Sequence, residues 1–194
     1  MILGAGLDTF AYRNPYPSLR VFEVDHPATQ ALKLRRLVGR GIAIPAGIVH
    51  VATDFAEASL SEVLRRAGFN VEAPAVFSWL GVVPYLERPA IDETLRFVGS
   101  LPRGSRIVFD YSRPASALGW LSRLVLNRMA RRVAAIGEPW KTFFEPEELA
   151  ALLQSVGLTV MADFGPEELN SRYFAGRTDR LRVGEAMRIV KAIV

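Results

Sequence analysis

Short apolar runs alternate with amphipathic stretches along this chain. The apolar runs, which are typical of buried strands, occupy residues 20–24, 48–52, 73–80, 106–111, 158–164 and 187–194. The amphipathic stretches, which predict helices, occupy residues 28–38, 60–67, 88–101, 118–136, 146–156 and 166–174. Strands that alternate with helices in this way predict an α/β fold with a doubly wound, mostly parallel sheet.

One interval between the predicted strands is much longer than the others. Residues 112–144 separate two strands and contain the predicted helix at 118–136, so we expect a helical insertion there. Such an insertion can act as a lid or as a wall of a substrate site. It can equally be a helix that covers the sheet, and the sequence does not decide between these roles.

The chain opens on the end of an apolar strand that runs into a glycine turn. Ile2 and Leu3 are followed by Gly4 and Gly6, which allow a tight bend and a close approach of the backbone to a ligand. In α/β proteins a turn at the carboxyl end of the first strand is the usual place for a nucleotide-like cofactor. The turn therefore predicts a cofactor site.

Acidic residues follow the next two predicted strands. Asp25 ends the second strand and can accept hydrogen bonds from both ribose hydroxyls of an adenosine. Asp54 and Phe55 end the third, where a carboxylate and a backbone N–H can bind the adenine edge while the phenyl ring covers its face. This ordered set predicts that Gly4, Gly6, Asp25, Asp54 and Phe55 bind an adenosine cofactor.

The residues that follow the turn narrow the choice of cofactor. A dinucleotide fold places a third glycine three residues after the second, where this chain has Thr9. Asp8 also puts a carboxylate where a pyrophosphate would lie, although it can simply cap a helix. A negative charge beside the turn favours a cofactor with a cationic amino-acid end, such as S-adenosylmethionine.

Composition limits the remaining possibilities. The 194 residues suffice for one α/β domain, and half of them are hydrophobic. No apolar run is long enough for a membrane span, no signal-peptide pattern follows Met1, and the cytoplasm is the default expectation. The chain has no cysteine, and no metal site is expected. Its net charge of +4 comes mostly from arginines, which we expect on solvated helix faces, so no nucleic-acid partner is expected.

Several motifs together resemble the leucine carboxyl methyltransferase family, and most closely its bacterial branch of S-adenosylmethionine-dependent methyltransferases, abundant in mycobacteria. The matching stretches are Leu3-Gly4-Ala5-Gly6-Leu7-Asp8-Thr9, Tyr12-Arg13, Phe22-Glu23-Val24-Asp25-His26-Pro27, Ala52-Thr53-Asp54-Phe55, Phe77-Ser78-Trp79-Leu80-Gly81-Val82, Ser105-Arg106-Ile107-Val108-Phe109-Asp110-Tyr111, Gly137-Glu138-Pro139-Trp140 and Arg172-Tyr173-Phe174. They extend over essentially the whole chain.

The resemblance implies a class I methyltransferase sheet, Rossmann-like, in which an antiparallel last strand at 187–194 pairs with 158–164. It implies cofactor contacts at the turn glycines, at Asp25 for the ribose, and at Asp54 with Phe55 for the adenine. Members that methylate a protein phosphatase have a glutamate after the fourth strand, where this chain has Leu80, so their substrate is not carried over. Members also have a helical segment before the turn, so residues 1–194 are expected to be one domain, truncated at the N-terminus relative to the family.

The expected activity is methyl transfer from S-adenosylmethionine to a carboxylate or hydroxyl on a small molecule. The sequence names no catalytic residue: His26 reads as a helix-start residue, and Tyr85, Tyr111 and Trp140 are either acceptor-pocket or core residues. One alternative is a non-catalytic remnant that binds the cofactor weakly or serves as an interaction domain. A nucleotide-dependent oxidoreductase is a weaker alternative, because of Thr9. The oligomeric state is not predicted.

Overall fold

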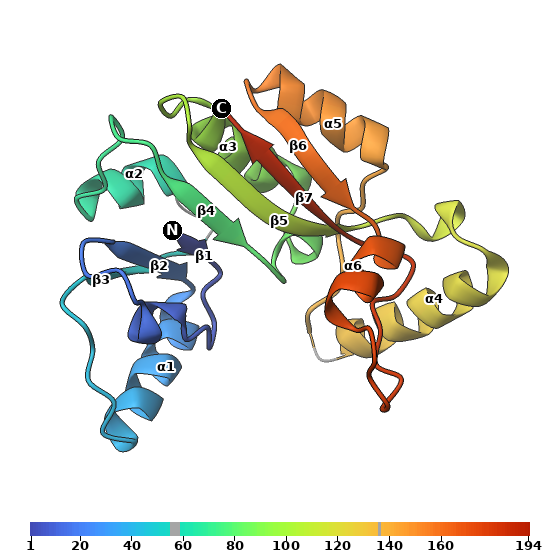
Figure 1. Ribbon diagram of the computed structural model, residues 1–194, viewed down its shortest axis with the longest axis horizontal. Helices are drawn as coiled ribbons and strands as arrows, with labels where there is room; N and C mark the ends of the chain where they lie inside the picture. The colour runs from blue at the N-terminus through green and yellow to red at the C-terminus, as the bar shows by residue number, and fades with distance from the viewer. Residues whose placement is uncertain (55–58, 136) are drawn as a thin grey trace.

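A twisted sheet of seven strands organises the computed structural model, which describes residues 1–54, 59–135 and 137–194 (Figure 1). The strand order is β3-β2-β1-β4-β5-β7-β6. The strands are β1 (Ile2–Leu3), β2 (Val21–Asp25), β3 (Ile48–Ala52), β4 (Val76–Trp79), β5 (Arg106–Ser112), β6 (Thr159–Phe164) and β7 (Met187–Ile193). The pairs from β3 to β5 are parallel, whereas β7 runs antiparallel to both β5 and β6. The mostly parallel sheet and the antiparallel last strand are confirmed.

The predicted helices are also present, with ends that shift by a few residues. They are α1 (Pro27–Gly39), α2 (Leu60–Arg66), α3 (Arg88–Gly99), α4 (Trp120–Ala135), α5 (Pro146–Ser155) and α6 (Pro166–Tyr173). Three short 3-10 helices were not predicted: η1 (Phe10–Arg13), η2 (Val83–Tyr85) and η3 (Ala115–Ala117). Pro occupies the first turn of α1, α3, α5 and α6, where its fixed φ suits a helix and no intrahelical hydrogen bond is lost.

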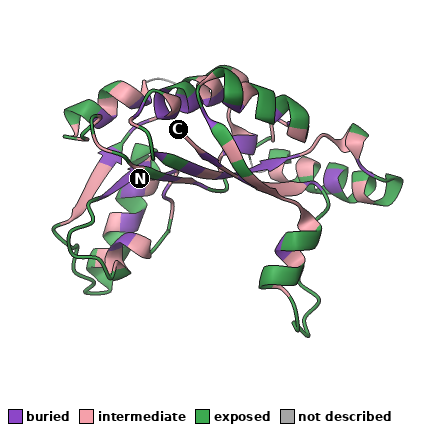
Figure 2. Ribbon diagram, turned by 45° about the horizontal axis from the view of Figure 1, so that its top comes forward, coloured by how far each residue is buried: buried purple, intermediate pink, exposed green. Residues whose placement is uncertain are grey.

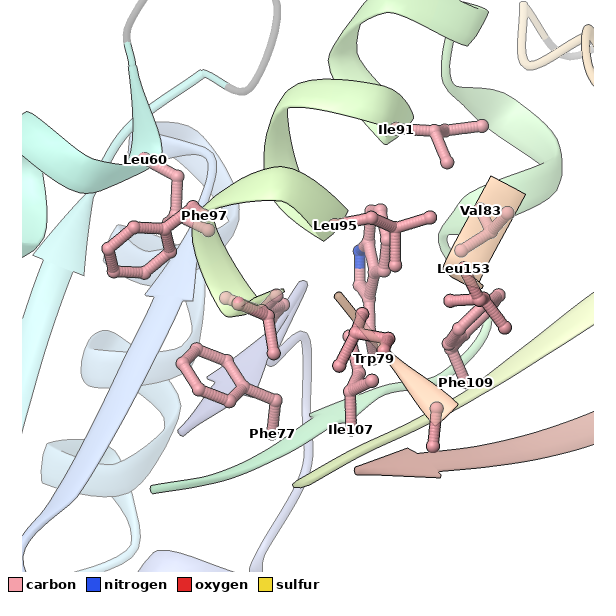
Figure 3. Close-up of a cluster of buried hydrophobic side chains, with 14 of the residues drawn as sticks. Leu60, Phe77, Trp79, Val83, Ile91, Leu95, Phe97, Ile107, Phe109 and Leu153 are labelled. Atoms are coloured by element: carbon pink, nitrogen blue, oxygen red, sulfur yellow. The ribbon is translucent and has the colours of Figure 1, made fainter. Parts of the chain in front are cut away.

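The main hydrophobic core lies on one face of the sheet, beneath α2, α3 and α5 (Figure 2). Because side chains alternate along a strand, Phe77 and Trp79 of β4 both point into this core. Trp79 packs against Phe109 of β5 with ring centroids 5.8 Å apart, and Leu95 of α3 lies over the indole (Figure 3). The apolar face of α3 thus covers the middle of the sheet.

The opposite face carries α1 and has a much smaller apolar cluster (Figure 2). The residues that α1 buries are polar, and Lys33 among them lies 2.8 Å from Oε2 of Glu23 on β2. The Tyr12 hydroxyl lies 3.0 Å from Nε2 of His50 on β3 and 3.3 Å from the same glutamate oxygen. An ion pair with its hydrogen-bonded neighbours therefore holds α1 and η1 against the sheet.

The predicted insertion at 112–144 contains η3 and α4. Figure 1 shows α4 beyond the end of the sheet and beside α6, rather than on a sheet face. Its buried residue Leu126 forms a small cluster with Leu118 and with Ala186, which precedes β7. The insertion therefore follows the carboxyl end of β5 and does not act as a sheet cover.

Replacing Leu95 by Ala should remove packing from the centre of the main core. Leu95 is fully buried against Trp79, so we expect Leu95→Ala to lower the free energy of unfolding by about 2–5 kcal/mol. Urea unfolding followed by tryptophan fluorescence measures this loss. Leu124→Ala, at an exposed position of α4, is the matched control and should change stability by less than about 0.5 kcal/mol. Equal effects of the two variants would contradict the assignment of the core.

Acidic pH should lower the free energy of unfolding, because His50 on the polar face of the sheet takes up a proton. Burial lowers the pKa of the His50 imidazole below its ordinary value of 6.5; Glu23 opposes this shift and Lys33 adds to it. As the pH falls below 6.5, the unfolded chain therefore binds more protons at His50 than the native chain does. The stability that the neutral imidazole contributes to the native state is lost in that range. His50→Gln should flatten the dependence of unfolding free energy on pH between 7.5 and 5.5. An unchanged slope in the variant would exclude His50 as the titrating group.

Candidate functional site at the carboxyl ends of the parallel strands

The glycine turn leaves β1 with backbone angles that favour glycine. Gly4 has φ +66° and Gly6 has φ +45°, both in the left-handed region. The N–H groups of Gly4 and Ala5 both donate to the carbonyl oxygen of Val24, at 2.8 and 3.1 Å. At Gly4 an added Cβ would lie 2.2 Å from Cγ2 of Val82, so the turn and the segment after β4 approach too closely for a side chain.

Asp25 lies directly against this turn, as the sequence predicts for two parts of one site. Its Oδ2 accepts a hydrogen bond from the N–H of Gly6, and its Oδ1 accepts one from the N–H of His26 at 2.6 Å. An ionised carboxylate has about four acceptor positions, so these two bonds orient the group and leave others for a ligand. These two backbone N–H groups thus fix the orientation of the Asp25 carboxylate beside the turn.

The end of β3 lies next to Asp25. Ala52 pairs in register with Asp25, and the N–H of Thr53 donates to the Asp25 carbonyl oxygen at 2.9 Å. This brings the half-buried Asp54 to the same edge of the sheet. Phe55, predicted to cover the adenine ring, lies outside the described residues. The structure therefore brings together Gly4, Gly6, Asp25 and Asp54 from three adjacent strand ends.

The end of β4 adds a contact that sequence reasoning missed, between Gly81 and Asp110. Gly81, with φ +73°, donates its N–H to Oδ1 of Asp110 at 2.6 Å. Asp110 lies near the end of β5, and burial raises the pKa of its carboxyl above the ordinary value, although the Gly81 N–H opposes this. An acidic residue near the end of an apolar strand was the available signal, the same signal that identified Asp25.

Other candidate side chains are engaged in holding the local structure. Nδ1 of His26 accepts a hydrogen bond from the N–H of Ala28 and caps α1, as predicted for a helix-start residue. Oδ1 of Asp8 accepts a hydrogen bond from the N–H of Phe10 at 2.6 Å, at the start of η1. Both side chains therefore satisfy backbone groups at a helix start.

The aromatic candidates for an acceptor pocket differ in exposure. Tyr111 is fully buried and donates its hydroxyl to Oδ2 of Asp163 at 2.6 Å; burial and this bond raise the pKa of the phenol. Arg188 of β7 donates to the other oxygen of that carboxylate at 3.0 Å. Tyr111 is thus a core residue that ties β5 to β6 and β7. Tyr85 and Trp140 are half-buried.

Two sizeable hollows flank the loop that follows the turn. One of about 660 Å³ lies between this loop and α1, and Asp8, Arg13 and Lys33 are among its lining residues. The other, of about 750 Å³, lies at the amino ends of β1, β2 and β4. Neither is lined by the turn glycines or by Asp25. Among the described residues, the candidate site is therefore defined by the ends of the strands.

The residues that are present fit an adenosine-type cofactor. An added Cβ at Gly6 would meet no atom closer than the Gly4 carbonyl oxygen at 3.9 Å, so this glycine leaves open space beside the turn. Asp25 borders that space with an oriented carboxylate, which can accept two ribose hydroxyls. The arrangement can bind and orient a ligand through main-chain groups and carboxylates.

Comparison with solved structures identifies the fold. The mitomycin 7-O-methyltransferase MmcR superposes with a TM-score of 0.59 and 17% identity, over 99% of this chain and 47% of that chain. Magnesium protoporphyrin IX methyltransferase (ChlM) from Synechocystis PCC 6803, solved with bound SAH, gives a TM-score of 0.58 and 10% identity, over 99% of this chain and 71% of that chain. The fold is that of class I methyltransferases.

Sequence comparison identifies the family. A Bacillus subtilis (strain 168) protein named "Putative S-adenosyl-L-methionine-dependent methyltransferase YktD" is 38% identical over 201 residues, which cover 100% of this chain and 64% of the relative. A Mycobacterium marinum protein with the same general name is 38% identical over 118 residues, 59% of this chain and 37% of the relative. The chain therefore spans less than two thirds of these relatives. The family profile described as leucine carboxyl methyltransferase matches residues 1–99, and the chain belongs to this family.

Proposed function

We propose that this chain binds S-adenosylmethionine at the carboxyl ends of β1, β2 and β3 and belongs to an enzyme that transfers the methyl group to a small-molecule carboxylate or hydroxyl. The observation that carries the proposal is the bond from the Gly6 N–H to the Asp25 carboxylate. It joins the glycine turn to the acid that would accept the ribose hydroxyls. Membership in the family and the methyltransferase fold support the same cofactor.

The proposed contacts divide the cofactor between the strand ends. Gly4 would allow the tight turn beside Val82, Gly6 would leave room for the amino-acid end of the cofactor, and Asp25 would hold the ribose. Asp54, together with Phe55 beyond the described residues, would hold the adenine. The carboxylates would also favour a ligand that carries positive charge, which a sulfonium and an ammonium both supply.

In methyl transfer the main task of the protein is to align the acceptor with the methyl group. When bound, S-adenosylmethionine supplies an electrophilic methyl group on its sulfonium sulfur. The protein has to hold the acceptor in line with that methyl group, and positioning of this kind lowers barriers by roughly 7–11 kcal/mol in well-oriented systems. A carboxylate acceptor needs no general base, whereas a hydroxyl acceptor usually does. We therefore assign no catalytic residue.

Two other functions would use the same strand ends, and only the second of them is an outcome of the binding test. A domain that binds the cofactor without turnover fits the same strand ends, because these ends supply cofactor contacts and no assigned catalytic residue. A nicotinamide-dependent oxidoreductase would instead bind NADH at the turn. Thr9, in the position of the third glycine of a dinucleotide motif, argues against it.

Calorimetry with S-adenosylmethionine and its demethylated product tests the cofactor assignment. We expect micromolar binding, and we expect Asp25→Ala to weaken it at least about a hundredfold, because two hydrogen bonds to a charged acceptor are lost. Glu72→Gln, at an exposed position before β4, is the control and should bind normally. Binding of NADH but not S-adenosylmethionine would refute the proposal, as would full binding by the Asp25 variant. Circular dichroism confirms that each variant is folded.

A pair of glycine variants separates backbone strain from loss of space. Gly4 and Gly41 have nearly the same φ, +66° and +64°, but an added Cβ meets Val82 only at Gly4. Gly41→Ala should cost about 1–2 kcal/mol of stability and leave cofactor binding unchanged. Gly4→Ala should cost more and abolish cofactor binding, because the turn must move away from Val82. Thermal unfolding and calorimetry measure both effects, and equal behaviour of the two variants would contradict the close-approach model.

A further inference from the structure

Helix α4 combines exposed apolar side chains with a one-sided charge. Its sixteen residues contain no acidic residue and four arginines: Arg123, Arg128, Arg131 and Arg132. Its exposed large apolar residues are Trp120, Leu121, Leu124, Val125 and Met129. Trp120 is 74% exposed, which is unusual for the largest apolar side chain in a helix.

The orientation of α4 puts two of these residues, Trp120 and Leu124, on its outer side. The side that faces the protein carries the buried Leu126 and the half-buried Ala130 and Val133. At 100° per residue, Trp120 and Leu124 point away from that side. Leu121, Val125 and Met129 follow at intervals of four and border a hollow of about 490 Å³ between α4 and α6. Trp120 and Leu124 therefore form an apolar patch on the outer side of the first half of α4.

The same outer side becomes basic in the second half of the helix. Arg128, Arg131 and Arg132 are exposed and follow the apolar residues toward the end of α4. Arg123 differs, because its guanidinium donates to the carbonyl oxygens of Ala115 and nearby loop residues. Glu167 and Glu185 line the inner hollow, and the exposed Glu138 follows the end of α4, where its N–H donates to the carbonyl oxygen of Val133. Three arginines thus face outward beyond an apolar patch.

We propose that the outer side of α4 is a docking surface for an anionic lipid bilayer. An interfacial helix buries apolar residues at the acyl boundary and places arginines among lipid phosphates, and tryptophan is favoured at that depth. The apolar half of α4 supplies the buried part, while Arg128, Arg131 and Arg132 complement the negative charge. No helix among the described residues has the length and apolar character needed to cross a membrane.

Charge and apolar area together favour a bilayer over other partners. A nucleic acid would satisfy the arginines but would leave Trp120 and Leu124 without an apolar counterpart. A second copy of the chain would cover the apolar residues but would bring two sets of arginines together. An anionic bilayer supplies both an apolar interior and phosphate charges. This inference is independent of the proposed cofactor site.

Sedimentation of the full chain with vesicles tests the docking surface. Vesicles of phosphatidylglycerol and phosphatidylcholine should bind the protein, and vesicles of phosphatidylcholine alone should bind it much more weakly. The triple variant Arg128→Gln, Arg131→Gln, Arg132→Gln should lose about a hundredfold in partitioning, at about fivefold per arginine. The control Arg65→Gln, Arg66→Gln, Arg103→Gln removes the same charge from exposed positions elsewhere and should lose far less.

Fluorescence reports whether the apolar half of α4 enters the bilayer. The emission of Trp120 should shift to shorter wavelength with anionic vesicles, and Trp120→Phe should remove most of the shift while the protein still binds. Equal loss in the two triple variants would overturn the proposal, because it would indicate non-specific charge. Binding without a Trp120 shift would also overturn it. So would binding of duplex DNA or RNA as strong as that of vesicles, or a dimer in light scattering that disappears in Leu124→Ser.

Discussion

The packing of α2, α3 and α5 onto one face of the sheet is the constraint on which the other features depend. Strand side chains alternate between faces, so burying Phe77 and Trp79 beneath α3 determines which residues of β4 face the opposite way. A shift of one residue in this strand would expose two aromatic rings. The packing therefore fixes the register of the parallel strands, and with it the positions at which they end.

The candidate site forms where those strands end. Gly6 meets Asp25 because β1 and β2 pair in register, and Asp54 arrives beside them through the pairing of Ala52 with Asp25. The contacts between these segments are largely main-chain hydrogen bonds. Such a site demands glycines and correctly placed carboxylates, and tolerates wide variation elsewhere. The fold is accordingly shared with solved structures at 17% and 10% identity.

Local pattern was sufficient to predict most of the architecture. Apolar runs and helix boundaries located the strands and helices. The alternation of strands with helices predicted a parallel sheet, which placed Gly4, Gly6 and Asp25 at one edge. The position of Asp110 near a strand end was a signal in the sequence, but its bond to Gly81 could not be predicted in this way, because it joins the ends of two different strands. The buried pair of Glu23 and Lys33 was also missed, since charged residues ordinarily indicate an exposed face. Both depend on contacts between distant segments, which periodicity does not encode.

The place of β7 has a consequence for synthesis on the ribosome. This strand is the last of the sheet along the chain, yet it lies between β5 and β6 and pairs with both. Until residues 187–193 emerge, β6 has no neighbour in the sheet, and the edge of β5 has open hydrogen-bonding groups. The pairing of β6 with the sheet must therefore wait until β7 has been synthesised. A ribosome that stalls within α6 would present two unpaired strand edges, which are prone to associate with other chains.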